Sequence, residues 1–142
     1  MEDLDEEIVL YLLGRLKEAH PFTLSRLSLL LDLEQLKAHG HRVTSFKYVF
    51  MPFGFYIHGF PPFLESLANV KKVVVKDEEG RPIRGFFRIT QQGNPELSPE
   101  LRRDIDRVVE KAGQLGDQEL NSLAIKRDEY QKLLDGSLPG WE

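Results

Sequence analysis

Six basic side chains gather on a segment that is predicted to form a β-hairpin. Three lysines lie on one predicted strand, and three arginines lie on or beside the other: Lys71, Lys72, Lys76, Arg81, Arg84 and Arg88. Several cations projecting from one hairpin could contact the phosphates of a nucleic acid. The same residues could instead keep an exposed face soluble and prevent an edge strand from pairing with another molecule. The sequence leaves both interpretations open.

A second feature is a dense run of aromatic residues that precedes the basic segment. Eight of the 14 aromatic residues (9 Phe, 4 Tyr and 1 Trp) fall within the 18 positions 46–63. Such a segment can stack on bases, form the centre of an interface with a partner protein, or fill the core between a sheet and helices. We expect at least Phe55 or Tyr56 to be accessible. The candidate partner-binding residues are Phe53, Phe55, Tyr56, Phe60 and Phe63.

Residues that commonly act in catalysis or bind metal lack the required spacing. The chain has no cysteine, which excludes thiolate zinc sites and a cysteine nucleophile. His39 and His41 have no third ligand at a known spacing. The serines Ser25, Ser28 and Ser45 stand outside a G-x-S-x-G turn, and neither G-x-G-x-x-G nor G-K-[ST] occurs. We therefore expect a protein that is not an enzyme and that holds no cofactor or metal ion.

Charge is distributed unevenly along the 142 residues. Residues 1–40 hold 4 Lys+Arg against 8 Asp+Glu, residues 41–90 hold 8 against 4, and residues 91–142 hold 7 against 11. The net charges of the three parts are thus −4, +4 and −4, which sum to −4. Any contact with phosphates would therefore use the central third of the chain.

The beginning of the sequence bears on location. The first residues are acidic, whereas a secretory signal begins with a basic region. The longest apolar run near the beginning, at 8–13, is far shorter than the roughly 20 residues that span a bilayer. We expect a cytoplasmic protein without a membrane segment. A charged fraction of 30% with no cysteine and two methionines would also suit a thermophilic source.

Hydrophobic periodicity predicts the elements that position these residues, starting with two helices. The first covers about 3–18, and the second begins with Thr23 as its N-cap and ends at Gly40. A strand is predicted at 44–50, followed by an aromatic loop at 52–62 that is punctuated by Pro and Gly.

A short helix at 63–67 and a hairpin with strands at 70–76 and 83–89 follow the loop. Ser98 is the predicted N-cap of the next helix, which Gly113 and Gly116 end.

The last predicted helix runs as one element from Asp117 to Leu134. Its apolar stripe could be buried on a second copy of the chain, which makes a homodimer one plausible assembly. The pattern predicts a single α+β domain over 1–135, mostly helical. A winged-helix-like centre lies within 1–90, a carboxy-terminal helical pair at 98–135, and a loose tail at 136–142.

Three stretches resemble a known family, the Panacea domain associated with proteolytic-adaptor antitoxins. The run LSRLSLLLD at 24–32 resembles the leucine-rich second helix of that domain, and FKYVFMPFGFY at 46–56 is similar to its aromatic strand and turn. GQL at 113–115, with the helix after it, resembles its carboxy-terminal helical pair. Phe53, Phe55 and Ile57 differ from the Tyr, Pro and hydroxyl residue usual in the family. The resemblance implies a non-enzymatic module that binds a partner protein, often a toxin.

Two functional hypotheses follow. The leading one is a cytoplasmic, antitoxin-like regulatory module that recognises a partner protein through the aromatic loop and the adjoining hairpin. The alternative is a winged-helix-like transcriptional regulator whose basic hairpin contacts nucleic acid. Only the second predicts binding that weakens steeply as salt concentration rises.

Overall fold

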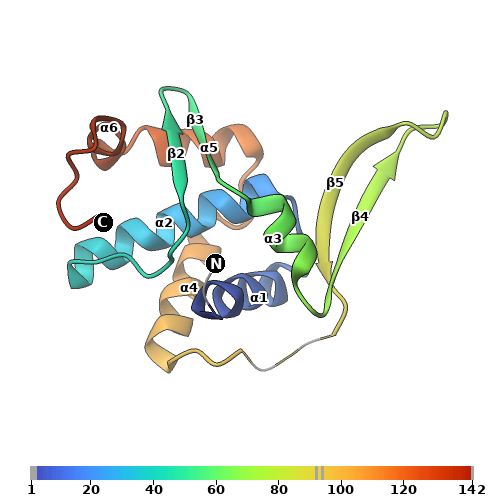
Figure 1. Cartoon of the computed structure of the whole chain (residues 1–142), viewed down its shortest axis with the longest axis horizontal. Helices are drawn as coiled ribbons and strands as arrows, with labels where there is room; N and C mark the ends of the chain where they lie inside the picture. Colours follow the sequence, from blue (N-terminus) through green and yellow to red (C-terminus); the bar gives the residue numbers. More distant parts are fainter. Residues whose placement is uncertain (1–2, 92, 94, 142) are drawn as a thin grey trace.

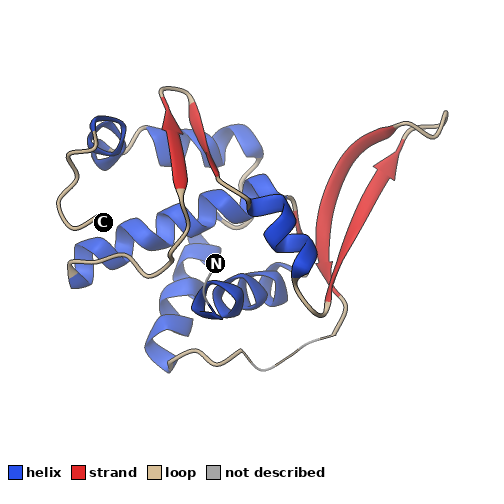
Figure 2. Cartoon of the chain, in the orientation of Figure 1, coloured by secondary structure: helices blue, strands red, loops and turns tan. Residues whose placement is uncertain are grey.

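Two antiparallel hairpins are attached to a body of helices (Figure 1). The computed structural model describes residues 3–91, 93 and 95–141. The helices within these residues are α1 (Asp3–Leu16), α2 (Pro21–His39), α3 (Phe60–Ser66), α4 (Pro99–Ala112), α5 (Asp117–Ile125) and α6 (Asp128–Asp135). The strands there are β1 (Glu18–Ala19), β2 (Tyr48–Met51), β3 (Gly54–Ile57), β4 (Val70–Lys76) and β5 (Pro82–Ile89). The fold is thus α+β and mostly helical, which confirms the predicted class (Figure 2).

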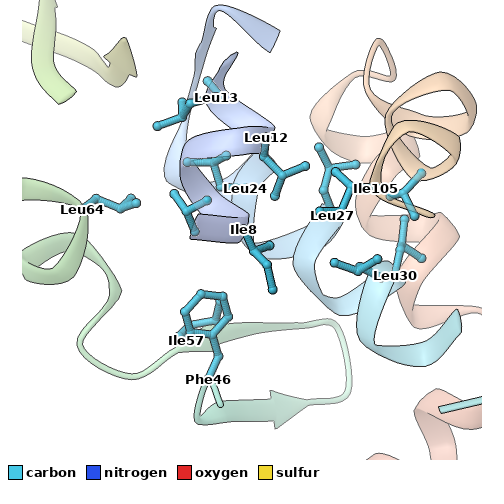
Figure 3. Close-up of a cluster of buried hydrophobic side chains, with 14 of the residues drawn as sticks. Ile8, Leu12, Leu13, Leu24, Leu27, Leu30, Phe46, Ile57, Leu64 and Ile105 are labelled. Atoms are coloured by element: carbon cyan, nitrogen blue, oxygen red, sulfur yellow. The ribbon is translucent and has the colours of Figure 1, made fainter. Parts of the chain in front are cut away.

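Helix α2 runs through the middle of the body (Figure 1), and all its residues from 24 to 33 are buried. Leucines face all sides of this stretch and must be covered, and α4, α5 and β3 pack directly against α2. The main core lies where side chains from α1 to α4 meet those of the segment around β2 and β3 (Figure 3). Its fully buried members include Ile8, Leu12, Leu24, Leu27, Phe46, Leu64 and Ile105.

A second, smaller core joins α2 to α5, α6 and β3, and its buried residues are Leu29, Leu33, Phe55, Ala124, Tyr130 and Leu133. Leu138 and Trp141 pack against this cluster, so the prediction of a loose tail is wrong for residues 136–141. The predicted single last helix is wrong as well, because the chain breaks into α5 and α6 at Lys126 and Arg127. Leu120, Ala124, Tyr130 and Leu133 are buried within the chain, whereas Leu123 of α5 is 42% exposed, and the homodimer stays a prediction.

The beginning of the chain differs from the prediction at two helix ends. Helix α1 stops at Leu16, where Lys17 adopts a left-handed φ of 73°, and β1 then pairs with β5. Helix α2 begins at Pro21, because the His20 side chain takes the N-cap place that the sequence assigned to Thr23. Its other end agrees with the prediction, since Gly40 is left-handed there with φ 79°.

The central segment departs most from the prediction. Instead of a strand at 44–50 and a loop at 52–62, β2 and β3 form an antiparallel hairpin in which Met51 faces Gly54. Helix α3 begins at Phe60, three residues before the predicted start at 63. We call the β2–β3 pair the aromatic hairpin.

The hairpin predicted at 70–89 is confirmed, and we call the β4–β5 pair the basic wing. Its register runs from Val70 opposite Ile89 to Lys76 opposite Pro82, with a bulge near the far end. Strand β1 joins β5 on its other side and gives the sheet order β1-β5-β4. The wing reaches away from the helices (Figure 1), and Phe87 near its base is buried in the main core.

Ser98 caps α4 as predicted, because its Oγ accepts a hydrogen bond from the Leu101 N–H at 3.1 Å. Gly113 and Gly116 mark the end of α4 and the beginning of α5, also as predicted.

Candidate functional site

Buried carboxylates hold the base of the aromatic hairpin. Asp32 on α2 accepts hydrogen bonds from the N–H groups of Val43 and Thr44, at 2.9 and 2.8 Å, and from the hydroxyls of Thr44 and Tyr48. Asp5 on α1 accepts the Ser45 N–H at 2.8 Å. These bonds fix the chain just before β2, where the sequence alone predicted an uninterrupted strand.

Burial sets the protonation of this network. It raises the pKa of Asp32, although the four donors favour the ionised carboxylate. Burial and the adjacent carboxylate raise the pKa of Tyr48 well above its ordinary value. The Tyr48 hydroxyl therefore stays protonated and donates a hydrogen bond to Asp32 at 2.8 Å.

The turn of the aromatic hairpin is fixed by two side chains from the carboxy-terminal helices. The Tyr130 hydroxyl lies 2.7 Å from the carbonyl oxygens of both Met51 and Gly54. Burial raises the pKa of Tyr130, so the hydroxyl stays protonated and can donate to them. Asn121 donates its Nδ2–H to the Phe53 carbonyl oxygen at 3.0 Å. The backbone of the turn is therefore held from behind by α5 and α6.

The structure divides the predicted partner-binding residues into two groups. Phe53 is 86% exposed and Tyr56 50% exposed, so the expectation of an accessible aromatic side chain is confirmed. Phe55 is buried in the second core and Phe60 in the main core, where Phe63 is half-buried beside Phe60. Sequence reasoning missed Met51, which is 45% exposed next to Phe53.

An open groove of about 650 Å³ lies beside the turn, and we call it the tip groove. The start of α2, the aromatic hairpin and the start of α3 form its walls. Side chains that line it include Phe22, Arg26, Met51, Phe53, Tyr56 and Pro61. The groove thus joins the two exposed aromatic residues to the first turns of α2.

Arg26 lies in the wall of the tip groove and is only 5% exposed. Its guanidinium carbon is 3.8 Å from the ring centre of Phe22 and 4.1 Å from that of Phe55. Nε and Nη2 both donate to Asn121 Oδ1, at 3.2 and 3.0 Å, and Nη1 donates to Ser25 Oγ at 3.0 Å. Burial lowers the pKa of Arg26 to about 10, so the group is still charged at neutral pH.

Sequence reasoning missed Arg26, although its signal was visible. It is the one basic residue in the run LSRLSLLLD, where the other members are leucine, serine and aspartate. A charged side chain in a buried segment needs hydrogen-bonding or charged partners inside the protein. Buried charged positions are therefore candidates for a functional site.

The basic wing offers fewer free cations than its composition suggests. Three of the six predicted phosphate-binding residues form ion pairs with nearby acids: Lys72 with Glu65 at 2.9 Å, Arg88 with Glu18 at 2.7 Å, and Arg81 with Asp77 at 3.1 Å. Over the described ranges, Lys71, Lys76 and Arg84 form no ion pair. The cations also divide between two faces, because Lys71 lies opposite Arg88 and Lys72 lies opposite the buried Phe87.

The chain matches no family model, no curated protein and no solved structure.

Among the residues that the structure describes, no group of three or more His, Cys, Asp or Glu side chains is placed to hold a metal ion, and the rings of His39 and His41 stack 6.3 Å apart. No helix in the described part of the chain combines the length and apolar character that crossing a membrane requires.

Proposed function

We propose that this protein is a non-enzymatic binding module that recognises a partner protein through the turn of the aromatic hairpin and the tip groove. The observation that carries the proposal is Phe53, which is 86% exposed on a turn whose backbone Tyr130 and Asn121 hold in place. A large aromatic side chain on a fixed support loses little conformational entropy on binding and is typical of the energetic centre of an interface.

The regulatory, antitoxin-like part of the proposal rests on the resemblance to the Panacea domain. The leucine-rich run that carries the resemblance forms the buried part of α2, and the aromatic motif contributes both strands of the aromatic hairpin. The partner would then be a toxin-like protein, and both proteins would act in the cytoplasm.

The test is capture of the partner by tagged protein, guided by the products of neighbouring genes. Phe53→Ser removes the exposed ring from the turn, where the side chain makes no core contact. We expect the wild-type chain to retain one toxin-like protein at equal stoichiometry and Phe53→Ser to lose it. The matched control is Ile83→Ser, because Ile83 is 66% exposed but lies on the basic wing. Equal binding by all three chains would overturn the proposal.

A second candidate function, nucleic-acid binding, is favoured by the placement of the basic wing. The wing extends from the body (Figure 1), and the pairing of the short strand β1, which follows α1, with β5 of the wing supports a winged-helix-like reading. Lys71, Lys76 and Arg84 would contact phosphates. Three such contacts predict a slope of about −2.7 for the logarithm of the association constant against that of salt concentration. Fluorescence anisotropy with duplex DNA measures this slope, and no binding at low salt would exclude this candidate.

A further inference from the structure

Arg26 is a buried positive charge whose protein contacts are all uncharged. It is 5% exposed, and it touches two phenyl rings, an amide and a hydroxyl. Within the described residues no carboxylate lies at ion-pair distance from it, and the favourable charge of Asp117 acts on it from farther away. Buried arginines are normally paired, because desolvating a charge without an opposite charge is costly. Arg26 is therefore a position where a bound anion would be favourable.

The hydrogen bonds of Arg26 leave room for that anion. A guanidinium has five N–H donors, and three of them are used by Asn121 and Ser25. One N–H remains on each of Nη1 and Nη2. Two parallel N–H groups match the two oxygens of a carboxylate, which is the geometry of the strongest arginine pairs.

The hairpin leaves the approach to Arg26 open. At Gly54 a side chain would begin only 3.3 Å from Nη2 of Arg26, and glycine places nothing there. Arg26, Phe22 and Gly54 all line the tip groove, so no side chain at position 54 stands between the groove and the guanidinium. Apart from Arg26, the groove is lined mainly by apolar side chains, which would hold a bulky apolar group next to the anion.

The shape and surroundings of the groove favour a chain segment over an enclosed small molecule. The groove is open along the aromatic hairpin and continues onto Phe53 and Met51, both well exposed. In the described residues β3 pairs only with β2, so its other edge is not paired with a strand, which is the kind of edge that extended peptides add to. A single cation among apolar groups suits a carboxylate on a peptide better than the repeated phosphates of a nucleic acid.

We propose that the tip groove binds an extended acidic segment of the partner, in which an Asp or Glu side chain forms a two-bond pair with Arg26. A neighbouring aromatic or long aliphatic side chain of that segment packs between Phe53 and the start of α2. This inference rests on the proposed function, because it names the chemistry by which the same surface recognises its partner.

The first experiment uses a pair of small probes that differ only in charge. The probe 3-phenylpropionate carries a phenyl ring and a carboxylate, and 3-phenylpropionamide is its neutral counterpart. Each is titrated into ¹⁵N-labelled protein while the Nε–H signal of Arg26 and the amide signals of β3 are followed. We expect saturable shifts at Arg26 with the carboxylate and at least about tenfold weaker binding of the amide. Equal binding of the two probes, or no saturable shift at Arg26, overturns the inference.

Variants show whether the charge of Arg26 is responsible. Arg26→Met replaces the guanidinium by an apolar side chain of similar length and should lose the preference for the carboxylate probe. Arg26→Lys keeps the positive charge but cannot form two parallel hydrogen bonds, so it should retain only part of the preference for the carboxylate probe. Arg84→Met is the matched control, because it removes an exposed cation outside the tip groove. Unchanged amide signals of α1, which contains none of the substituted residues, show that each variant is folded.

Binding of the captured partner separates failure of this inference from failure of the proposed function. Suppose that Phe53→Ser loses the partner while Arg26→Met binds it as well as the wild-type chain. The proposed pair between Arg26 and a carboxylate is then wrong, and the proposed partner-binding surface around Phe53 is retained. If neither substitution weakens binding, the proposed function fails as well. Loss of the partner with both supports the acidic segment.

Discussion

The two hairpins of this protein share a backbone pattern and differ in what supports them. Tyr130 and Asn121 hold the turn of the aromatic hairpin, and Asp32 fixes the chain before its first strand. The turn of the basic wing is held within itself, where Asp77 accepts the N–H groups of Glu79 and Arg81, each at 2.9 Å. One hairpin is therefore part of the folded body, while the other is attached at one end.

This difference shows that two well-exposed apolar side chains can have different structural support. Ile83 on the wing is 66% exposed and Phe53 on the aromatic hairpin 86% exposed. The turn under Phe53 is held by side chains of α5 and α6, whereas Ile83 lies near the bulge of the wing, where β5 pairs with β4. The charges of the wing are exposed as well, but half of the six predicted cations are neutralised by adjacent acids.

The largest expected effect comes from removing the carboxylate that anchors the aromatic hairpin. Asp32→Ala leaves two N–H groups and two hydroxyls without their acceptor in a buried site. We expect the free energy of unfolding to fall by about 3–5 kcal/mol, measured by urea denaturation. Asp77→Ala is the control in the wing, where the same change should cost about 1 kcal/mol or less because water replaces the lost bonds. Equal losses would refute the contrast between the hairpins.

Removing one hydroxyl should loosen the turn of the aromatic hairpin. Tyr130→Phe keeps the ring in the second core and loses the donor to Met51 and Gly54. The expected loss of stability is about 1–2 kcal/mol. Hydrogen exchange should accelerate in β2 and β3 and stay unchanged in β4 and β5. A uniform acceleration in both hairpins would mean that the turn is not supported separately.

The contrast also explains which parts of the molecule the sequence reveals. The basic wing was predicted correctly, because its β-branched strands flank a turn of Asp, Glu and Gly and its pairing is local. The aromatic hairpin was missed, because its turn residues Pro52 and Phe53 lack the Asn-Gly or Gly signal of a two-residue hairpin.

Long-range contacts account for the rest of the site. Arg26 meets Asn121 across 95 positions, and Tyr130 meets Met51 across 79. No local pattern encodes such pairs. The exposed tip could be expected from the aromatic run, but the groove and its buried charge depend on how α2, the hairpin and α5 come together.

A smaller effect is expected on the pH dependence of stability, through His20, which lies near Arg84 of the wing. The Nδ1 atom of His20 accepts the Phe22 N–H at 3.0 Å, which requires the neutral ring. Burial and the positive charge of Arg84 on the wing lower the pKa of His20. The unfolded chain therefore takes up the proton first, at about pH 6.5, and stability falls as the pH drops below that value. His20→Asn retains a cap and should flatten this part of the pH profile, measured by thermal unfolding between about pH 7.5 and 5. An unchanged profile would show that His20 does not control it.

The smallest effect on stability is expected from the wing cations that lack an acidic partner. Lys71→Gln, Lys76→Gln and Arg84→Gln together remove three exposed charges, and surface changes of this kind stay within about 0.5 kcal/mol each. Because such changes have either sign, urea denaturation should show only a small net change, and partner binding through Phe53 should be retained in full. DNA binding, if the wild-type chain has it, should lose most of its salt dependence in this variant. Loss of partner binding would place the wing inside the protein interface and end the functional separation of the two hairpins.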